Sequence, residues 1–273
     1  MHEIGEGRGD GSRVYLQEGL AGHEEMVAEF RSWDWEWIVG VTRKNGWGLP
    51  DANQLFVGSQ GATTPLHYDE RENIFIQAAG QKTVILFPVT EYLACYPFPV
   101  GHPCDRQSMV DVETYFSDPA QQAAFPRFAE ANGYYTTLNP GDLLYIPYGW
   151  WHFLTSDTQP TISISFWALT KKLEPTIDAD GKVLLTPLHL VRVRRNIEEM
   201  ILKSFVDSGM HPASAFADLM QELRTGKYSG TFSAILPNLR SILRSVNFSD
   251  AQQDKFLIET IESRYGIDHQ SYV

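Results

Sequence analysis

The middle of this 273-residue chain carries short β-like runs separated by turn-forming residues, and this pattern limits the folds open to it. Turn signals such as Ala79-Gly80 and Asn139-Pro140-Gly141-Asp142 stand between the runs. The runs are Gln54–Val57, Ile74–Gln77, Lys82–Phe87, Leu143–Ile146 and Thr161–Trp167. Many short strands with Pro and Gly corners favour a mainly β fold, either a sandwich or a barrel.

Helical spacing of apolar residues flanks the β-like region on both sides. On the N-terminal side it covers Glu24–Val41. On the C-terminal side the helix candidates are 187–205, Ala215–Leu223 and Asp254–Arg264. We therefore expect a β domain at residues 1–170 and a helical segment at residues 171–273. The insert Thr90–Thr136 is rich in aromatic residues and proline, and we expect a packed loop there.

Charge and cysteine content narrow the range of partners. The chain has 22 basic and 34 acidic residues and a net charge of -12, so nucleic acid is not expected as a partner. A basic or neutral peptide would be easier to receive. There are two cysteines, no apolar signal segment and no stretch long enough to span a bilayer. We expect a protein without a membrane anchor in a reducing compartment, the cytoplasm or the nucleus.

Two histidines and an aspartate form the most informative pattern. In an extended chain, residues two apart point to the same side, so His67 and Asp69 can converge on one point. A second imidazole, His152, follows a Pro/Gly turn and two tryptophans. Two imidazoles and one carboxylate make the facial triad of non-haem iron(II) oxygenases, which leaves positions open for a chelating cosubstrate and O2. Taken singly, each histidine is better explained without a metal, His67 as a surface or turn residue and His152 as a core residue beside Trp150 and Trp151.

A lysine in the third β-like run adds a second signal. Alternation places Lys82 on the same face as Val84 and Leu86, and a lysine facing an apolar interior is costly unless an anion meets it. The far carboxylate of a bound dicarboxylate would be such an anion. The alternative is an ordinary solvated lysine at a sheet edge.

Hydrogen-bonding side chains can line the same interior. One side of the last run carries polar residues and the other carries apolar ones, which is the pattern of a barrel wall with a hydrogen-bonding inner face. The polar side holds Thr161, Ser163, Ser165 and Trp167. Tyr15, Thr64 and Asn73 can add further donors.

Several motifs together resemble the family of factor inhibiting hypoxia-inducible factor, the asparaginyl hydroxylases of the JmjC/cupin superfamily. They are TPLHYDE at 64–70, YPFPVGHPCDRQS at 96–108, PGDLLYIPYGWWH at 140–152 and FW at 166–167. The HxD…H pattern is common to the superfamily, whereas HPCDRQS is specific. The resemblance covers most of the chain. It implies a double-stranded β-helix (jelly roll) with a C-terminal helical segment that forms a homodimer.

The resemblance also implies roles for individual residues. His67, Asp69 and His152 would bind Fe(II), with 2-oxoglutarate and O2 as cosubstrates. The residues implied to surround 2-oxoglutarate are Tyr15, Thr64, Asn73, Lys82, Ser165 and Trp167, with Ser165 standing where the family has Asn. Gln17, Arg106 and Gln107 would contact the substrate. The implied reaction is β-hydroxylation of asparagine in a protein such as an ankyrin-repeat protein or a transcription factor of the hypoxia response.

Other interpretations stay open at this point. The triad does not separate an asparaginyl hydroxylase from a JmjC-type lysyl demethylase or a hydroxylase of another residue. The non-enzyme alternative is an inactive cupin-like protein that holds a metal or ligand without turnover. A zinc hydrolase would use the same ligands with a water. An intact triad together with Lys82 favours the oxygenase.

Overall fold

The computed structural model describes residues 13–20, 24–170, 176–181, 183–209, 218–219, 221–222, 225–227 and 231–265. The chain folds into two units, one made of residues 1–87 and 133–172 and the other of residues 88–132 and 173–273. The expected boundary near residue 170 lies beside the end of the first unit. The insert at 88–132, which we expected in the first domain, instead groups with the C-terminal helices.

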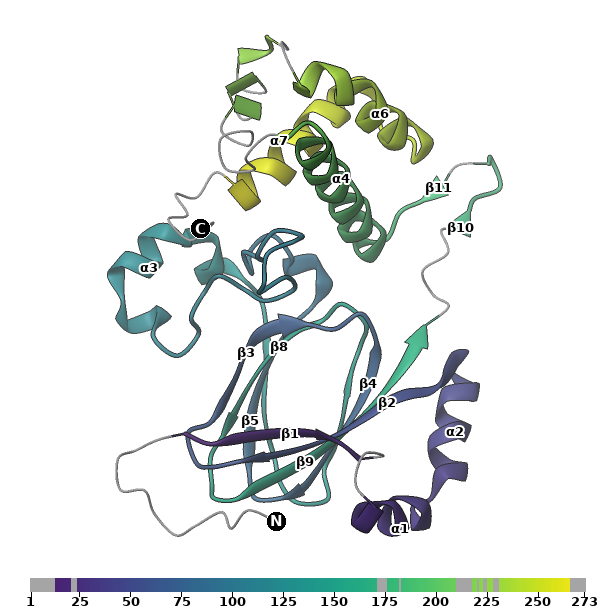
Figure 1. Ribbon diagram of the computed structural model, residues 1–273, viewed down its shortest axis with the longest axis vertical. Coiled ribbons are helices and arrows are strands. Elements are labelled where there is room, and N and C mark those ends of the chain that lie inside the picture. Colours follow the sequence, from purple (N-terminus) through teal and green to yellow (C-terminus); the bar gives the residue numbers. More distant parts are fainter. Residues whose placement is uncertain are drawn as a thin grey trace. The chain divides into compact units, whose positions relative to one another are not determined.

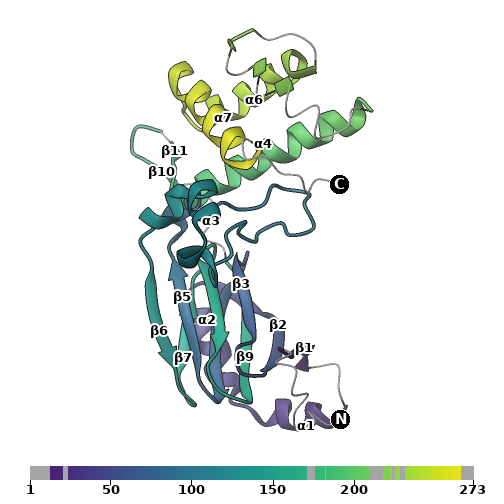
Figure 2. The ribbon, with the colours of Figure 1, turned by 90° about the vertical axis from the view of Figure 1, so that its left-hand side faces the viewer.

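The first unit contains two antiparallel sheets. The five-stranded sheet has the order β1 (Tyr15–Gly19), β2 (Trp47–Gly58), β9 (Thr161–Thr170), β4 (Glu72–Ala79) and β7 (Leu143–Ile146). The four-stranded sheet has the order β3 (Thr63–Tyr68), β8 (Trp151–Ser156), β5 (Lys82–Phe87) and β6 (Tyr134–Leu138). The two sheets face each other (Figures 1 and 2). This is the jelly roll, or double-stranded β-helix, so the predicted fold class is confirmed.

The space between the two sheets is packed from both sides. Phe75, Leu144 and Ile146 of the five-stranded sheet pack in one cluster with Val84, Leu86, Leu138 and Leu154 of the four-stranded sheet. On β9 the expected alternation is present, because Ser163 and Ser165 are buried in the interior while Ile164 packs on the outer face. The interior therefore holds apolar and polar groups side by side.

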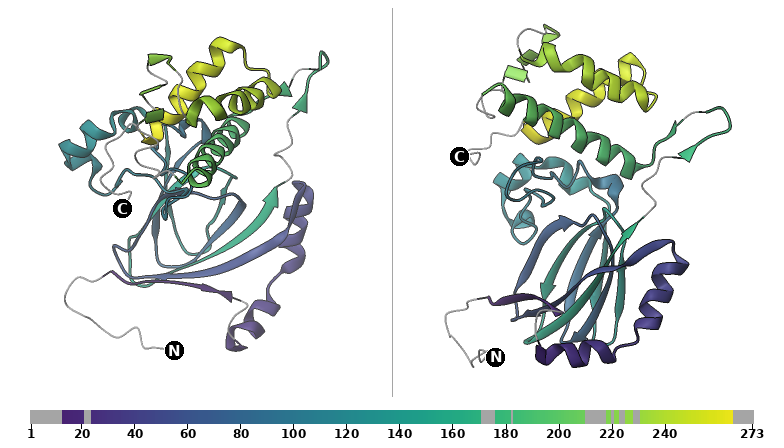
Figure 3. Two further views of the ribbon diagram at one scale, coloured as in Figure 1. Left: turned by 45° about the horizontal axis from the view of Figure 1, so that its top comes forward. Right: turned by 45° about the vertical axis from the view of Figure 1, so that its right-hand side comes forward.

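Two helices cover the outer face of the five-stranded sheet (Figure 3). We expected one helix over Glu24–Val41, and the structure has α1 (Glu24–Ser32) and α2 (Trp35–Lys44). The break is local, because the Asp34 side chain accepts the Trp37 N–H at 2.9 Å and caps the second helix. The Ile38 side chain then packs in one cluster with Ile74 and Phe166 of the sheet.

The second unit is mainly helical. Its segment 88–132 holds the short 3₁₀ helices η2 (Val89–Glu91), η3 (Tyr115–Ser117) and η4 (Pro126–Glu130), with α3 (Pro119–Ala124). The remaining elements are β10 (Thr176–Ile177), β11 (Val183–Leu184), α4 (Pro187–Asp207), α6 (Thr231–Ser245) and α7 (Asp250–Tyr265). The two segments are joined where Arg195 of α4 donates to both carboxylate oxygens of Asp105, at 2.7 and 2.9 Å. This bidentate pair explains why 88–132 groups with the helices.

The apolar stripe of α4 changes the argument for a homodimer. The sequence predicts more apolar surface on the helices near 187–205 and 213–224 than a thin layer on a jelly roll would bury. In the structure, Ile197, Ile201 and Phe205 of α4 are buried against α6 and α7 of the same chain. That surface is no evidence for a partner subunit, and the homodimer stays a prediction. The expected helix at Ala215–Leu223 lies largely outside the described residues. Among the described helices, none is both long and apolar enough to cross a bilayer.

Candidate metal centre

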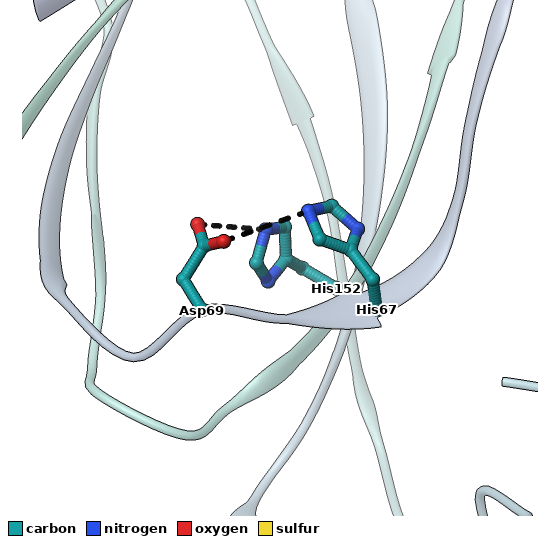
Figure 4. Close-up of side chains that lie close together, drawn as sticks. All are labelled: His67, Asp69 and His152. Carbon is teal, nitrogen blue, oxygen red and sulfur yellow. Dashed lines mark ion pairs between the residues drawn. The ribbon is translucent and has the colours of Figure 1, made fainter. Parts of the chain in front are cut away.

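His67, Asp69 and His152 come together inside the jelly roll. The pairing of β3 with β8 places His67 opposite His152, and Asp69 follows directly after β3. His67 Nε2 lies 3.9 Å from Asp69 Oδ1, and His152 Nε2 lies 3.7 Å from Asp69 Oδ2. Figure 4 shows both imidazoles and the carboxylate pointing toward one place, and all three donor atoms lie within 4.8 Å of one another. One cation can therefore be contacted by all three side chains with small adjustments.

Hydrogen bonds prepare both imidazoles for a metal. His67 Nδ1 lies 2.9 Å from the Pro65 carbonyl, and His152 Nδ1 lies 3.1 Å from the Trp150 carbonyl. A carbonyl only accepts, so each Nδ1 carries the proton and each Nε2 presents its lone pair to Asp69. Burial, helped by the nearby His67, lowers the pKa of His152 from 6.5 to about 4. His152 is thus neutral at pH 7 and does not require deprotonation to bind a cation.

The carboxylate of Asp69 is held by a tryptophan. The indole Nε1–H of Trp167 donates to Asp69 Oδ2 at 2.8 Å. The resemblance implied that Trp167 lies near the cosubstrate, and its visible contact is with the candidate ligand. Such a contact fixes the direction of a ligating carboxylate and restrains its rotation.

Removing this contact gives the first testable outcome. Trp167→Phe keeps an aromatic ring but removes the N–H donor, so Asp69 loses an orienting bond. We expect the affinity for Fe(II) or Mn(II) to fall about tenfold, as is usual for partners of metal ligands. Equilibrium dialysis measures this affinity directly. Unchanged metal binding by Trp167→Phe would show that the indole only fills space.

Lys82 lies at the first position of β5, in the interior and 2% exposed. Its amino group is 5.5 Å from the ring centre of Tyr15, 6.0 Å from that of Phe56 and 5.7 Å from that of Phe75. Burial lowers the pKa of Lys82 to about 8. No carboxylate of the described residues forms an ion pair with it, so the aromatic faces are its visible electrostatic partners. A buried cation of this kind is suited to an anionic ligand.

Hydroxyl groups gather around the same lysine. Thr64 Oγ1 donates to the Tyr15 hydroxyl at 3.1 Å, and burial raises the pKa of that Tyr15 hydroxyl. Ser156 stands opposite Lys82 in the β5–β8 pairing, and its Oγ lies 2.8 Å from Thr161 Oγ1. The structure therefore brings together Tyr15, Thr64 and Lys82, the set predicted for a distal carboxylate, and adds two hydroxyls that the sequence did not single out for this role.

Buried polar atoms also lie on the inner face of β4 and β9. Asn73 is 2% exposed and Ser165 is 1% exposed. Within the described ranges, Asn73 Oδ1 and Ser165 Oγ have no hydrogen-bond partner. Asn73 pairs in register with Trp167, the residue that contacts Asp69. Unsatisfied buried polar atoms call for a water or a polar ligand. A cation at the triad and a dicarboxylate reaching Lys82 fit this donor set.

The three residues implied to contact a substrate belong to two different units. Gln17 belongs to β1, is exposed and donates to Gln54 Oε1. Arg106, exposed and with a φ of 70°, and the half-buried Gln107 belong to the second unit, while the triad belongs to the first. The neighbouring Asp105 pairs with Arg195 of α4. The predicted substrate contacts therefore stay predictions.

Comparison with known proteins agrees with the fold. The model of the family described as "Cupin-like domain" matches residues 8–168. Over 110 residues the chain is 36% identical to "Lysine-specific demethylase 8" of Xenopus tropicalis, covering 40% of this chain and 23% of that protein. It is 35% identical over 122 residues to "Lysine-specific demethylase JMJ30" of Arabidopsis thaliana, covering 45% and 27%. It is 31% identical over 160 residues to "HSPB1-associated protein 1" of Homo sapiens, covering 57% and 29%. The chain thus spans less than a third of the length of these relatives.

Proposed function

Since this chain belongs to the cupin-like domain family, we propose that it is an Fe(II)- and 2-oxoglutarate-dependent oxygenase that acts on another protein. One observation carries the proposal. The same interior holds a His-Asp-His donor set and a buried lysine whose ion-pairing partner is not found among the described residues. The chain is related to proteins with JmjC domains, including two named lysine-specific demethylases.

Each part of the site has a separate task in this reaction. His67, Asp69 and His152 would hold the metal ion, and a set of three protein ligands would leave room for a cosubstrate. Lys82 and the hydroxyls around it bind the far carboxylate of 2-oxoglutarate and so fix its orientation. Bound Fe(II) supplies the activation of O2 and the oxidation of a C–H bond, coupled to conversion of 2-oxoglutarate to succinate and CO2. The apolar cluster of Phe75, Leu86 and Ile146 keeps part of the interior dry.

Two other interpretations fit fewer of these observations. A zinc hydrolase would use the same three ligands, but it has no use for a buried cation with an anion site. An inactive cupin-like protein that holds a metal without turnover would use the same donor set, but it needs no buried cation for a dicarboxylate beside that set. The buried Lys82 therefore favours the oxygenase over both.

For the target residue we propose asparagine, β-hydroxylated in an extended peptide segment. The support is the HPCDRQS motif at 102–108, since a glutamine amide such as that of Gln107 can both donate to and accept from an asparagine amide. Hydrogen-bond selection of this kind discriminates far better than apolar shape. The competing target is methylated lysine, favoured by the printed names of the relatives.

Matched peptides decide between the targets. Peptides that differ only in Asn, Ala or methyl-lysine at one position are incubated with wild type and with Gln107→Leu, and mass spectrometry follows the product. We expect oxidation of the Asn peptide by wild type and a loss of about tenfold or more in Gln107→Leu. Gln81→Leu, a change at an exposed glutamine of the first unit, serves as the control. Oxidation of methyl-lysine but not of asparagine would reverse the assignment.

A further inference from the structure

A buried carboxylate follows Asp69 closely in the chain without being one of the three candidate ligands. Glu72 is the first residue of β4, three positions after Asp69, and is 3% exposed. Its Oε2 accepts two hydrogen bonds, one from the Tyr145 hydroxyl at 2.7 Å and one from the Tyr148 backbone N–H at 3.0 Å. Burial and this contact raise the pKa of Tyr145 well above its usual value, so its hydroxyl stays a donor.

The second of these bonds reaches the turn that precedes His152. The turn covers residues 147–150 between β7 and β8, and its glycine has a φ of 76°, a conformation that favours glycine. The next backbone donor in the turn, the N–H of Gly149, bonds to the Asp69 carbonyl at 3.0 Å. The last residue, Trp150, offers its carbonyl to His152 Nδ1 at 3.1 Å. The turn thus contacts the backbone of Asp69 and the imidazole ring of His152, two of the candidate ligands.

Glu72 and Asp69 therefore hold this turn at two adjacent points. Tyr148 N–H is tied to the Glu72 side chain and Gly149 N–H to the Asp69 backbone. If the hydrogen bond from Tyr148 N–H to Glu72 is lost, the turn is still held by the bond from Gly149 N–H to the Asp69 carbonyl, and it can rotate about that bond. The Trp150 carbonyl, which sets the orientation and tautomer of His152, moves with the turn. A shift of the imidazole then changes where its Nε2 lies relative to Asp69 and His67.

We propose that Glu72 is a positioning residue of the metal centre, whose side chain holds the 147–150 turn and through it the imidazole of His152. The inference rests on the proposed metal site, but not on the identity of the cosubstrate or target. Glu72 acts as a hydrogen-bond acceptor for two donors, the Tyr145 hydroxyl and the Tyr148 N–H. A replacement at position 72 that keeps an acceptor oxygen should preserve the geometry of the metal centre. A replacement of similar volume without an acceptor should disturb that geometry.

The test uses Co(II) as the probe, because its visible absorption reports the geometry of the ligands as well as their occupancy. Co(II) is titrated into the full chain of wild type and of Glu72→Met, Glu72→Gln and Glu72→Ala. Methionine has similar bulk but no strong acceptor, whereas glutamine keeps an acceptor oxygen. Alanine leaves room for a water to satisfy the donors without fixing the turn, so it stays informative if the methionine variant does not fold.

A buried carboxylate of the second unit supplies the matched control. Glu198 of α4 is 0% exposed and accepts the Val100 N–H at 3.0 Å, so it also bonds a backbone donor while buried. Glu198→Met makes the same chemical change in the second unit. Thermal unfolding of every variant separates a loss of stability from a change in the metal centre, since a purely structural Glu72 would lower the melting temperature alone.

We expect Glu72→Met and Glu72→Ala to weaken Co(II) binding by about tenfold or more and to alter its visible spectrum. Glu72→Gln should restore the affinity to within about threefold of wild type, and Glu198→Met should bind Co(II) as wild type does. Wild-type affinity and spectrum in both Glu72→Met and Glu72→Ala would overturn the positioning role. So would a Glu72→Gln variant as impaired as Glu72→Met. If wild type itself bound no Co(II) in a manner that depends on His67, the proposed function would fail first.

Discussion

Asp69→Ala is expected to abolish Fe(II)-dependent conversion of 2-oxoglutarate to succinate while leaving the jelly roll folded. Asp69 supplies the single negative charge of the donor set, and its oxygens lie 3.9 and 3.7 Å from the two imidazole Nε2 atoms. Without it, two neutral imidazoles face the cation, and the attraction of the carboxylate is lost. The side chain is 21% exposed and follows the end of β3, so its removal leaves no large cavity.

A second aspartate of the same unit makes the comparison clean. Asp51 of β2 pairs with Arg71 at 3.0 Å at the surface. Asp51→Ala removes an equal charge, and exposed pairs contribute little to stability. We expect it to keep wild-type turnover and metal affinity. Turnover at the wild-type rate by Asp69→Ala, measured as succinate per enzyme, would remove Asp69 from the ligand set.

Lys82→Met is expected to raise the apparent KM for 2-oxoglutarate about a hundredfold, because the far carboxylate of the cosubstrate would then be buried without a cationic partner. Loss of one partner of a buried charge pair costs about 3 kcal/mol, which corresponds to that factor. Methionine keeps the length and apolar bulk beside Phe56 and Phe75. Lys44→Met, a change at an exposed lysine of α2, is the control and should leave the KM unchanged.

The same variant has an expected effect on stability without ligand. Burial lowers the pKa of Lys82 from 10.5 to about 8. Below pH 8 the amine is protonated in the folded and unfolded chains, so folding carries the full desolvation cost. Between about pH 8 and pH 10.5 the unfolded chain binds more protons, so wild-type stability should rise with pH, by about 3 kcal/mol in all.

Lys82→Met should lose that rise and be more stable than wild type at pH 7 when no ligand is present. Urea unfolding at pH 7.5 and pH 10 measures the difference between the two proteins. 2-Oxoglutarate should stabilise wild type at pH 7.5 and have little effect on the variant. A KM equal to that of wild type, with the same pH dependence of stability in both proteins, would contradict the assignment of Lys82.

Much of the β framework follows from local sequence. The expected runs Lys82–Phe87 and Leu143–Ile146 coincide with β5 and β7, and Thr161–Trp167 lies within β9. The strands β1, β6 and β8 were not predicted as strands, and the bounds of β3 were not given. The first three residues of β6 fell within the expected loop Thr90–Thr136, because the pairing of β6 with β5 joins residues on opposite sides of a long insert. Pairings of that kind leave no mark in local periodicity.

The site shows the same division between local and non-local information. The two-residue spacing of His67 and Asp69 and the alternation around Lys82 are local, and they pointed to the residues that converge in the interior. Ser156 and Glu72 were missed for these roles, because Ser156 meets Lys82 across a strand pair and Glu72 meets a turn far along the chain. The motif HPCDRQS at 102–108 pointed to Arg106 and Gln107, which belong to the second unit. Their role in binding a substrate at the triad rests on the family resemblance.

Formation of succinate from 2-oxoglutarate tests the central claim most directly. Wild type is incubated in air with 2-oxoglutarate and ascorbate, with Fe(II), with Zn(II) or with no metal, in the presence and absence of Asn peptides. Mass spectrometry quantifies succinate, with Asp69→Ala as the blank for free iron. We expect wild type to form succinate with Fe(II) but not with Zn(II) or without metal. A peptide that is oxidised should increase the amount of succinate formed with Fe(II). Succinate no higher than in the Asp69→Ala blank, in every peptide arm, would contradict the assignment of this chain as a 2-oxoglutarate-dependent oxygenase.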